Sequence, residues 1–212
     1  MKILKWLLIS IGSLIGLLLI LAGIFYFLAS RPPAIKSEMR PVEVSAEATH
    51  SLEQKVKSFQ QEVEGAARAG EKKPVKLEIT EGELTSKLNQ FIQEQTSKEE
   101  LPIEVKNIQV NVKNGELLLA GEANISGVKF QGGAKAAMRT EDGKIKLEVS
   151  KVDLGRLPLP GKVKKKVMSL IPEGGTTLKL EDLPIGLEKG LPVDLKNVRL
   201  EDGKLIIEGV TK

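Results

Sequence analysis

The segment LPIEVKNI of residues 101–108 recurs as LPVDLKNV in residues 191–198. Each copy is followed by a turn and a second apolar run, NGELLLAG at residues 114–121 and DGKLIIEG at residues 202–209. Asn-Gly or Asp-Gly between apolar runs is the strongest short-range signal of a β-hairpin. The sequence therefore predicts one hairpin that is used twice.

Both copies of the hairpin share an irregularity in their first strand. In the first copy, the alternation of Ile103 and Val105 resumes out of phase at Ile108, and the second copy slips at the equivalent residues. A slip of one residue would turn every following inward side chain outward. We therefore expect a β-bulge at the Lys-Asn pair that both copies contain.

The chain between the two copies alternates with a period of two. A third turn, Asp142-Gly143, joins residues 128–140 to residues 144–154, so an antiparallel meander of four long strands is expected. Glycines inside strands mark bulges, bends or close backbone approach, and they predict a strongly curved sheet. The glycines concerned are Gly121, Gly127, Gly132 and Gly133, of which Gly127 also fits an ordinary loop at a strand end.

Two helices are expected before the meander. Residues 51–68 begin with a capping box of Ser51 and Gln54, end before Gly70, and carry an apolar stripe of Leu52, Val56, Phe59, Val63 and Ala67. After a strand at residues 75–79, Thr80 and Glu83 form a second capping box. The apolar face of the helix that follows is Leu84, Leu88, Phe91, Ile92 and Gln95.

The N-terminal segment is expected to be a transmembrane helix. Residues 7–28 carry no charge, and a helix of this length spans about 33 Å, enough to cross a bilayer. The run is too long for a cleaved signal peptide and lacks a cleavage site, which indicates an uncleaved signal anchor. We predict an anchor at residues 1–30, a linker at 31–49 and an extracytoplasmic domain at 50–212, with the N-terminus in the cytoplasm.

Composition excludes several classes of function. Lys2, Lys5 and Arg31 flank the apolar run, and the remaining charges nearly balance, which argues against a nucleic-acid partner. The chain has no cysteine and one histidine, His50, which excludes disulfides, thiolate catalysis and zinc sites of several histidines. We therefore expect no enzyme, no cofactor and no metal site. The fold class expected is α+β: an anchor, then one curved sheet of meander plus repeated hairpin on two or three helices.

A short basic helix is expected at residues 162–171. Its lysines, which would contact anionic headgroups, are Lys162, Lys164, Lys165 and Lys166. Its apolar face consists of Val163, Val167, Leu170 and Ile171. The alternative is a surface helix whose apolar side packs into the core.

The order of these elements resembles known families. The opening VKLEITEGELTSKLN at residues 75–89, the segment VDLGRLPLP at residues 152–160 and the closing hairpin at residues 198–209 are similar to YpmS-type membrane-anchored proteins of Gram-positive bacteria and to LmeA-like phospholipid-binding proteins of actinobacteria. The likeness covers about residues 75–209. It implies an extracytoplasmic lipid-binding role, with a curved sheet wrapped on helices as in half of a tubular lipid-transfer domain, and it supplies no catalytic residue.

Two functions follow from this reading. The first is binding of lipid acyl chains by the apolar faces of two helices, with membrane lipids as partners; the binding residues are Leu84, Leu88, Phe91 and Ile92 together with Val163, Val167, Leu170 and Ile171. The second is a non-enzymatic structural or regulatory module with a solid core that docks an envelope protein. An apolar groove or cavity of several hundred Å³ favours the first function, and a domain without one favours the second.

Overall fold

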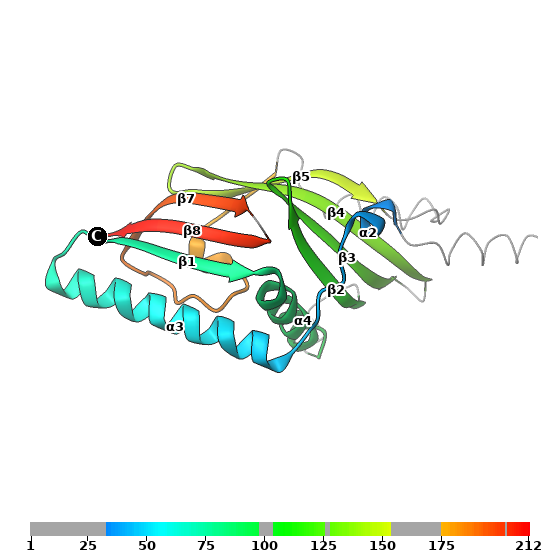
Figure 1. Cartoon of the computed structure of the whole chain (residues 1–212), viewed down its shortest axis with the longest axis horizontal. Helices are drawn as coiled ribbons and strands as arrows, with labels where there is room; N and C mark the ends of the chain where they lie inside the picture. Colours follow the sequence, from blue (N-terminus) through cyan, green and yellow to red (C-terminus); the bar gives the residue numbers. More distant parts are fainter. Residues whose placement is uncertain (1–32, 98–103, 126–127, 154–174, 202) are drawn as a thin grey trace, which may run out of the picture.

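The computed structural model describes residues 33–97, 104–125, 128–153, 175–201 and 203–212. Within these ranges the chain forms two antiparallel sheets and three α-helices, an α+β architecture as expected (Figure 1). The predicted anchor at residues 1–30 and the predicted basic helix at residues 162–171 lie outside the described residues. Among the described helices, none combines the length and the hydropathy that a bilayer crossing requires.

The larger sheet has five strands, all antiparallel, in the order β2-β3-β4-β5-β6. Its strands are β2 (Glu104–Lys113), β3 (Glu116–Ile125), β4 (Val128–Glu141), β5 (Lys144–Asp153) and β6 (Thr176–Leu178). The expected four-stranded meander is confirmed, and β6 extends it by one short strand. Both residues of the Asn114-Gly115 turn and both residues of the Asp142-Gly143 turn have positive φ, as two-residue hairpin turns of this type require.

The second hairpin copy lies in a separate sheet. β7 (Val193–Glu201) and β8 (Lys204–Thr211) pair with β1 (Pro74–Thr80) in the order β1-β8-β7. The expectation of one sheet that contains both the meander and the repeated hairpin is therefore wrong. The physical reason is that β1 takes the free edge of β8 along its whole length, from Pro74 opposite Val210 to Thr80 opposite Lys204.

Both expected bulges are present, and each lies near a glycine on the partner strand. The register shifts after Lys106 in β2 and after Leu195 in β7. A Cβ on Gly121 would lie 3.3 Å from the carbonyl oxygen of Lys106, and a Cβ on Gly209 would lie 2.9 Å from that of Asp194. The bulged strand approaches so closely that a side chain at Gly209 would have to displace the backbone of β7.

Helix α3 (Ala46–Ala69) begins earlier than expected. Its N-cap is Ser45, whose side-chain oxygen accepts a hydrogen bond from the backbone N–H of Ala48 at 3.1 Å, so the expected cap at Ser51 is wrong. Residues 46–49 include two alanines and a glutamate that favour the helix and extend it upstream. The helix ends at Gly70 in the left-handed conformation, as expected, and lies along the three-stranded sheet (Figure 1).

The hydrophobic core lies between α3, the three-stranded sheet and one end of the five-stranded sheet. Its fully buried side chains come from each of these layers: Leu52, Val63, Ile79, Val110, Ile145, Leu205 and Ile207. Residues 183–187, after the 3-10 turn η1 (Leu180–Asp182), add Leu183, Ile185 and Leu187. The core therefore covers only part of the five-stranded sheet.

The exposed side of β1 carries a carboxylate between two lysines, and this arrangement predicts a pH dependence of stability. Glu78 lies 2.7 Å from Lys76 and 3.1 Å from Lys204, and hydrogen bonds from both lower its pKa from 4.5 to about 2. A depressed folded-state pKa contributes stability above pH 4.5 that is lost as the pH falls toward 2. Glu78→Gln should thus destabilise the protein in urea titrations at pH 7 and have little effect near pH 2.

The control for this prediction removes both lysines. In a chain that carries Lys76→Met and Lys204→Met, the Glu78→Gln substitution should lose its effect at pH 7. An equal effect of Glu78→Gln at pH 7 in the presence and absence of the lysines would contradict the assignment.

Candidate functional site

The five-stranded sheet has one apolar and one polar face. Two neighbouring cross-strand rows on one face are wholly aliphatic: Leu117, Ala136 and Val149, and then Leu119, Ala134 and Val152. On the opposite face, Lys135 lies between Leu118 and Lys151. Alternation of this kind is typical of a sheet that buries one face and exposes the other to water, although Leu118 and Ala120 on this second face are buried.

The core covers only one end of the apolar face. In the first row, Leu117 and Ala136 are 7% and 1% exposed. Further along the sheet, four aliphatic side chains of this face are only half-buried: Val105, Ala123, Ala134 and Val152. We call this part of the apolar face the open end. The apolar face thus continues past the core, toward the end of β3 and the start of β4.

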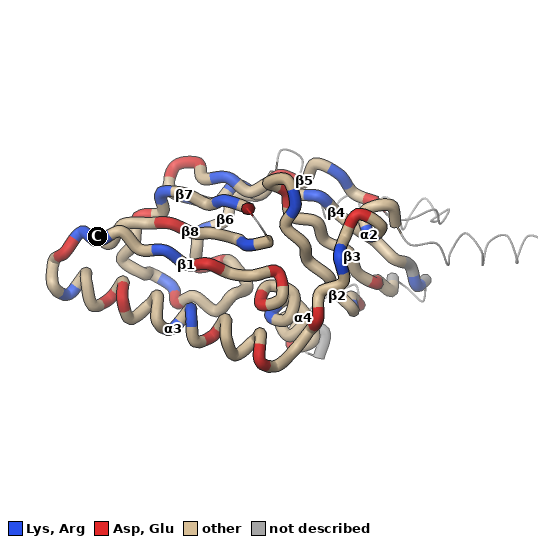
Figure 2. Tube along the Cα trace, viewed as in Figure 1, with Lys and Arg blue, Asp and Glu red and all other residues tan. Residues whose placement is uncertain are grey.

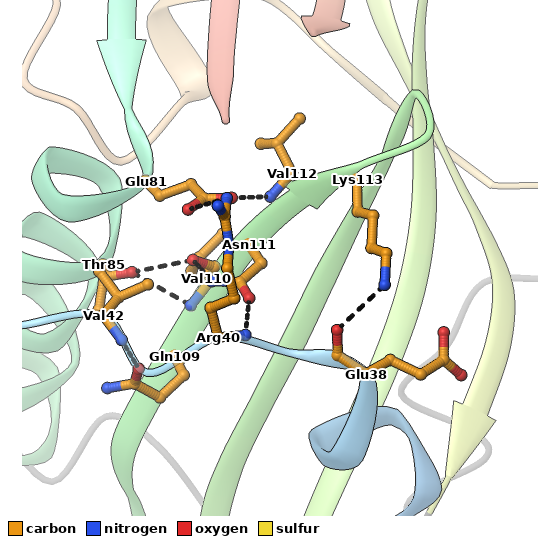
Figure 3. Close-up of polar contacts among 10 residues, drawn as sticks. All are labelled: Glu38, Arg40, Val42, Glu81, Thr85, Gln109, Val110, Asn111, Val112 and Lys113. Atoms are coloured by element: carbon orange, nitrogen blue, oxygen red, sulfur yellow. Dashed lines mark hydrogen bonds and ion pairs between the residues drawn. The ribbon is translucent and has the colours of Figure 1, made fainter. Parts of the chain in front are cut away.

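Helix α4 (Glu81–Ser97) covers the edge of this sheet by a ladder of side-chain hydrogen bonds. Its residues Glu81, Thr85 and Asn89 bond the main-chain groups of every second residue of β2: Val112, Val110 and Ile108. Four helical residues advance about 6 Å and two strand residues about 7 Å, so the two spacings nearly match. The helix therefore occupies the place of a neighbouring strand beside β2 (Figure 3).

The ladder also sets the direction of α4 relative to the open end. The ladder begins with the hydrogen bond between Glu81 and Val112 and ends with the bond between Asn89 and Ile108. The next turn of the helix therefore continues toward Val105. The last turns of α4 therefore lie beside the open end of the apolar face.

The four binding residues expected on α4 are divided between two environments. Leu84 is 6% exposed in the core, and Leu88 packs against the core. Phe91 is 37% exposed and Ile92 is half-buried. Phe91 and Ile92 thus belong to the part of α4 that the ladder directs toward the open end, whereas Leu84 lies in the core and Leu88 packs against it. The other expected contacts, at residues 162–171, lie outside the described residues.

The segment of residues 33–45, which we call the strap, runs along β2 in the antiparallel sense. The N–H groups of Arg40 and Val42 donate hydrogen bonds to the side-chain oxygens of Asn111 and Gln109, at 2.5 and 2.7 Å (Figure 3). Lys113 donates to the carbonyl oxygen of Glu38 at 3.4 Å. Alternate side chains of β2 therefore bind alternate residues of the strap, while the backbone of β2 is bonded to α4.

The upstream end of the strap is held on the polar face of the sheet. Helix α2 (Ala34–Glu38) buries Ile35 completely, at a point where a Cβ on Gly133 would lie only 3.2 Å from the Cβ of Ile35. The backbone N–H of Ala34 donates to Asp153 at 2.8 Å. Lys135 lies 2.6 Å from Glu38 and, through this hydrogen bond, lowers the pKa of the Glu38 carboxyl.

The strap differs from the linker expected at residues 31–49. Residues 34–38 and 46–49 are helical, and the segment between them is bonded to the domain. Sequence reasoning missed Thr85, Asn89, Gln109 and Asn111, whose only signal was polar side chains at regular spacing on α4 and β2. The close approach expected at Gly133 is confirmed by its contact with Ile35.

Three clefts in the described part of the chain have mainly polar linings. The largest, of about 630 Å³, lies between β7 and the β4–β5 turn and contains Lys144, Lys179, Lys196 and Lys212 with Asp142, Glu181, Glu188 and Asp194. Clefts of about 500 and 450 Å³ lie beside Arg40 and beside Lys129. Their charged linings do not match an acyl chain.

The described ranges hold the one histidine of the chain and no cluster of candidate metal ligands. Within them, no three His, Asp or Glu side chains are grouped as a metal ion would require. His50 is exposed on α3 and lies 3.0 Å from the side-chain nitrogen of Gln54.

No family model, no curated protein and no solved structure matches the chain. The likeness to the YpmS-type and LmeA-like families therefore stays a prediction from the sequence.

Proposed function

We propose that this is a membrane-anchored protein whose extracytoplasmic domain binds lipid acyl chains along the open end of the apolar sheet face. The observation that carries the proposal is the continuation of that face past the core. There Val105, Ala123, Ala134 and Val152 are half-buried, and the ladder directs the turn of α4 that carries the exposed Phe91 toward this end. An aliphatic surface of this kind suits a hydrocarbon chain, which needs neither hydrogen bonds nor aromatic stacking.

The energetic scale is adequate for reversible binding. Burial of a methylene group contributes about 0.8 kcal/mol, so about eight methylenes would supply about 6 kcal/mol before the costs of association. The uncharged run at residues 7–28, as a transmembrane anchor, would hold the domain beside its ligand source.

Photo-crosslinking in vesicles tests the proposal. The full chain would be reconstituted with a phosphatidylcholine that carries a diazirine in its acyl chain, irradiated, and mapped by peptide mass spectrometry. We expect crosslinks at α4 residues 91–95 and on the apolar face of β3–β5, in addition to the anchor. Crosslinks confined to residues 1–30 would contradict lipid binding by the domain.

A matched pair of substitutions makes this test specific. Ala134→Lys places a charge at the open end and should strongly reduce crosslinking of the domain. Ala137→Lys places the same charge on the opposite face, where Ala137 is also half-buried and pairs with Glu148, and should leave crosslinking unchanged. Equal effects of the two variants would count against a binding role for the apolar face.

The alternative function is a docking module for an envelope protein. It is favoured by the core positions of Leu84 and Leu88 and by the charged linings of the three clefts. The same crosslinking experiment separates the two functions, because a docking module would acquire no acyl-chain crosslinks in its domain.

A further inference from the structure

The strap is bonded to the domain from its first described residues onward. Pro33 and Ile35 are buried, Ala34 bonds Asp153, and Arg40 and Val42 bond side chains of β2. At the downstream end, the N–H of Ser45 donates to the hydroxyl of Ser86 at 3.1 Å. The chain is therefore fixed on the domain at Pro33, thirteen positions before helix α3 begins at Ala46.

The stretch of chain between the apolar run and the domain is consequently short. From Leu28 to Pro33 the chain can span at most about 18 Å, whereas an unbound strap would allow about 60 Å from Leu28 to Ser45. A free strap of that length would let the domain tumble above a bilayer. A tether of about 18 Å holds the attachment point of Pro33 close to the surface.

The attachment point lies at one end of an elongated molecule. Helix α2, the end of β3 and the start of β4 lie toward one end of the long axis (Figure 1). The end of α3 and the C-terminus lie at the other end. Electrostatic attraction to the membrane does not favour either end, since basic and acidic residues are interspersed along both sheets in the described part of the chain (Figure 2). The tether therefore determines which end meets the membrane.

We infer that the domain stands on the bilayer by the end of the five-stranded sheet that carries the start of β4, with the three-stranded sheet pointing away. The interaction partner is the lipid surface of the membrane that holds the anchor. The inference rests on the anchor in the proposed function but not on acyl-chain binding. It brings the open end of the apolar face next to the headgroups, so that an acyl chain can pass from the bilayer to the sheet without crossing water.

Fluorescence quenching at two engineered cysteines tests this orientation, because the chain has no native cysteine. Lys129, at the start of β4, and Lys72, just after α3, are both exposed and form a matched pair. Lys129→Cys and Lys72→Cys would be labelled with bimane in the full chain, reconstituted in phosphatidylcholine vesicles that contain a nitroxide-headgroup lipid. We expect quenching several times stronger at residue 129 than at residue 72.

Each other outcome overturns the inference and identifies what failed. Equal quenching, or stronger quenching at residue 72, would show a free or inverted domain. Absence of quenching at both sites in protein that floats with the vesicles would show a domain held away from the surface. Protein that does not float would refute the anchor itself, and with it the proposed function.

A variant that releases the strap provides the control. Ile35→Asp places a charge in the buried contact with Gly133 and should reduce the difference in quenching between the two sites. Lys36→Asp, at the exposed neighbouring residue, should preserve the difference. Circular dichroism would verify that both variants remain folded, and an unchanged difference in folded Ile35→Asp would contradict the role assigned to the strap.

Discussion

Replacement of Glu83 by alanine is expected to lower the free energy of unfolding by about 2–4 kcal/mol. Glu83 is 5% exposed and joins three elements at one carboxylate. It accepts hydrogen bonds from Ser51 at 2.7 Å, from Lys55 at 2.8 Å and from the backbone N–H of Thr80 at 2.8 Å. The alanine variant would leave these donors, on α3 and at the end of β1, without their acceptor.

The carboxylate of Glu83 stays charged despite its burial. Burial acts to raise its pKa, but the hydrogen bonds from Lys55, Thr80 and Ser51 together outweigh that effect and lower the pKa below its usual value. A charged acceptor forms stronger hydrogen bonds than a neutral one, which is why its removal has a large effect.

Glu53→Ala is the matched control for Glu83→Ala. Glu53 on α3 forms a 2.8 Å ion pair with Lys87 on α4, so it links the same two helices, but its side chain is 48% exposed. Because exposed ion pairs contribute little, the loss should be under about 1 kcal/mol in urea titrations of the full chain in mild detergent. Equal losses for the two variants would refute the special role of Glu83.

The local elements of this fold could be predicted from sequence because they depend on short-range chemistry. The turn at Asn114-Gly115, the bulges after Lys106 and Leu195, and the capping pair of Thr80 and Glu83 are all present in the structure. Each depends on residues that are close in the chain. Turn chemistry and the Thr80 cap therefore needed no knowledge of tertiary partners, whereas the capping pattern at Ser51 misplaced the start of α3, whose N-cap is Ser45.

The assignment of strands to sheets could not be predicted in the same way. A period of two says which side chains share a face, but it does not say which edges meet. β1 precedes the meander in the chain yet pairs with β8 at the C-terminus, and this pairing separates the second hairpin from the first. Equivalent sequences thus entered different sheets because their free edges met different strands.

The strap and the ladder on α4 were missed because polar residues on a strand or helix usually indicate a solvated face. Gln109 and Asn111 alternate with apolar residues as solvent-facing side chains would, yet they bind the backbone of the strap. The apolar residues of α4 were correctly grouped on one helix, but the division between core and open end depends on where the three-stranded sheet stops. That boundary has no signal in the helix itself.

Thr85→Val is expected to lower the free energy of unfolding by about 2–3 kcal/mol although the two side chains have nearly the same shape. Thr85 is fully buried, and its hydroxyl accepts from the N–H of Val110 at 3.1 Å and donates to the carbonyl of Val110 at 3.3 Å. The valine would leave the buried N–H of Val110 without an acceptor, and the carbonyl of Val110 would keep only its 2.9 Å hydrogen bond from the side-chain nitrogen of Asn111. Urea titration of the full chain, monitored by circular dichroism, measures the loss.

Thr140→Val makes the same chemical change without breaking a ladder. The hydroxyl oxygen of Thr140, on β4, is buried and has no hydrogen-bond partner among the described residues, so its replacement by a methyl group should be neutral or slightly stabilising. Similar losses for the two variants would mean that the valine side chain itself, and not the lost bonds to Val110, is responsible. A loss confined to Thr85→Val would mean that α4 stabilises β2 as a neighbouring strand does, through the main-chain groups that an edge otherwise leaves open.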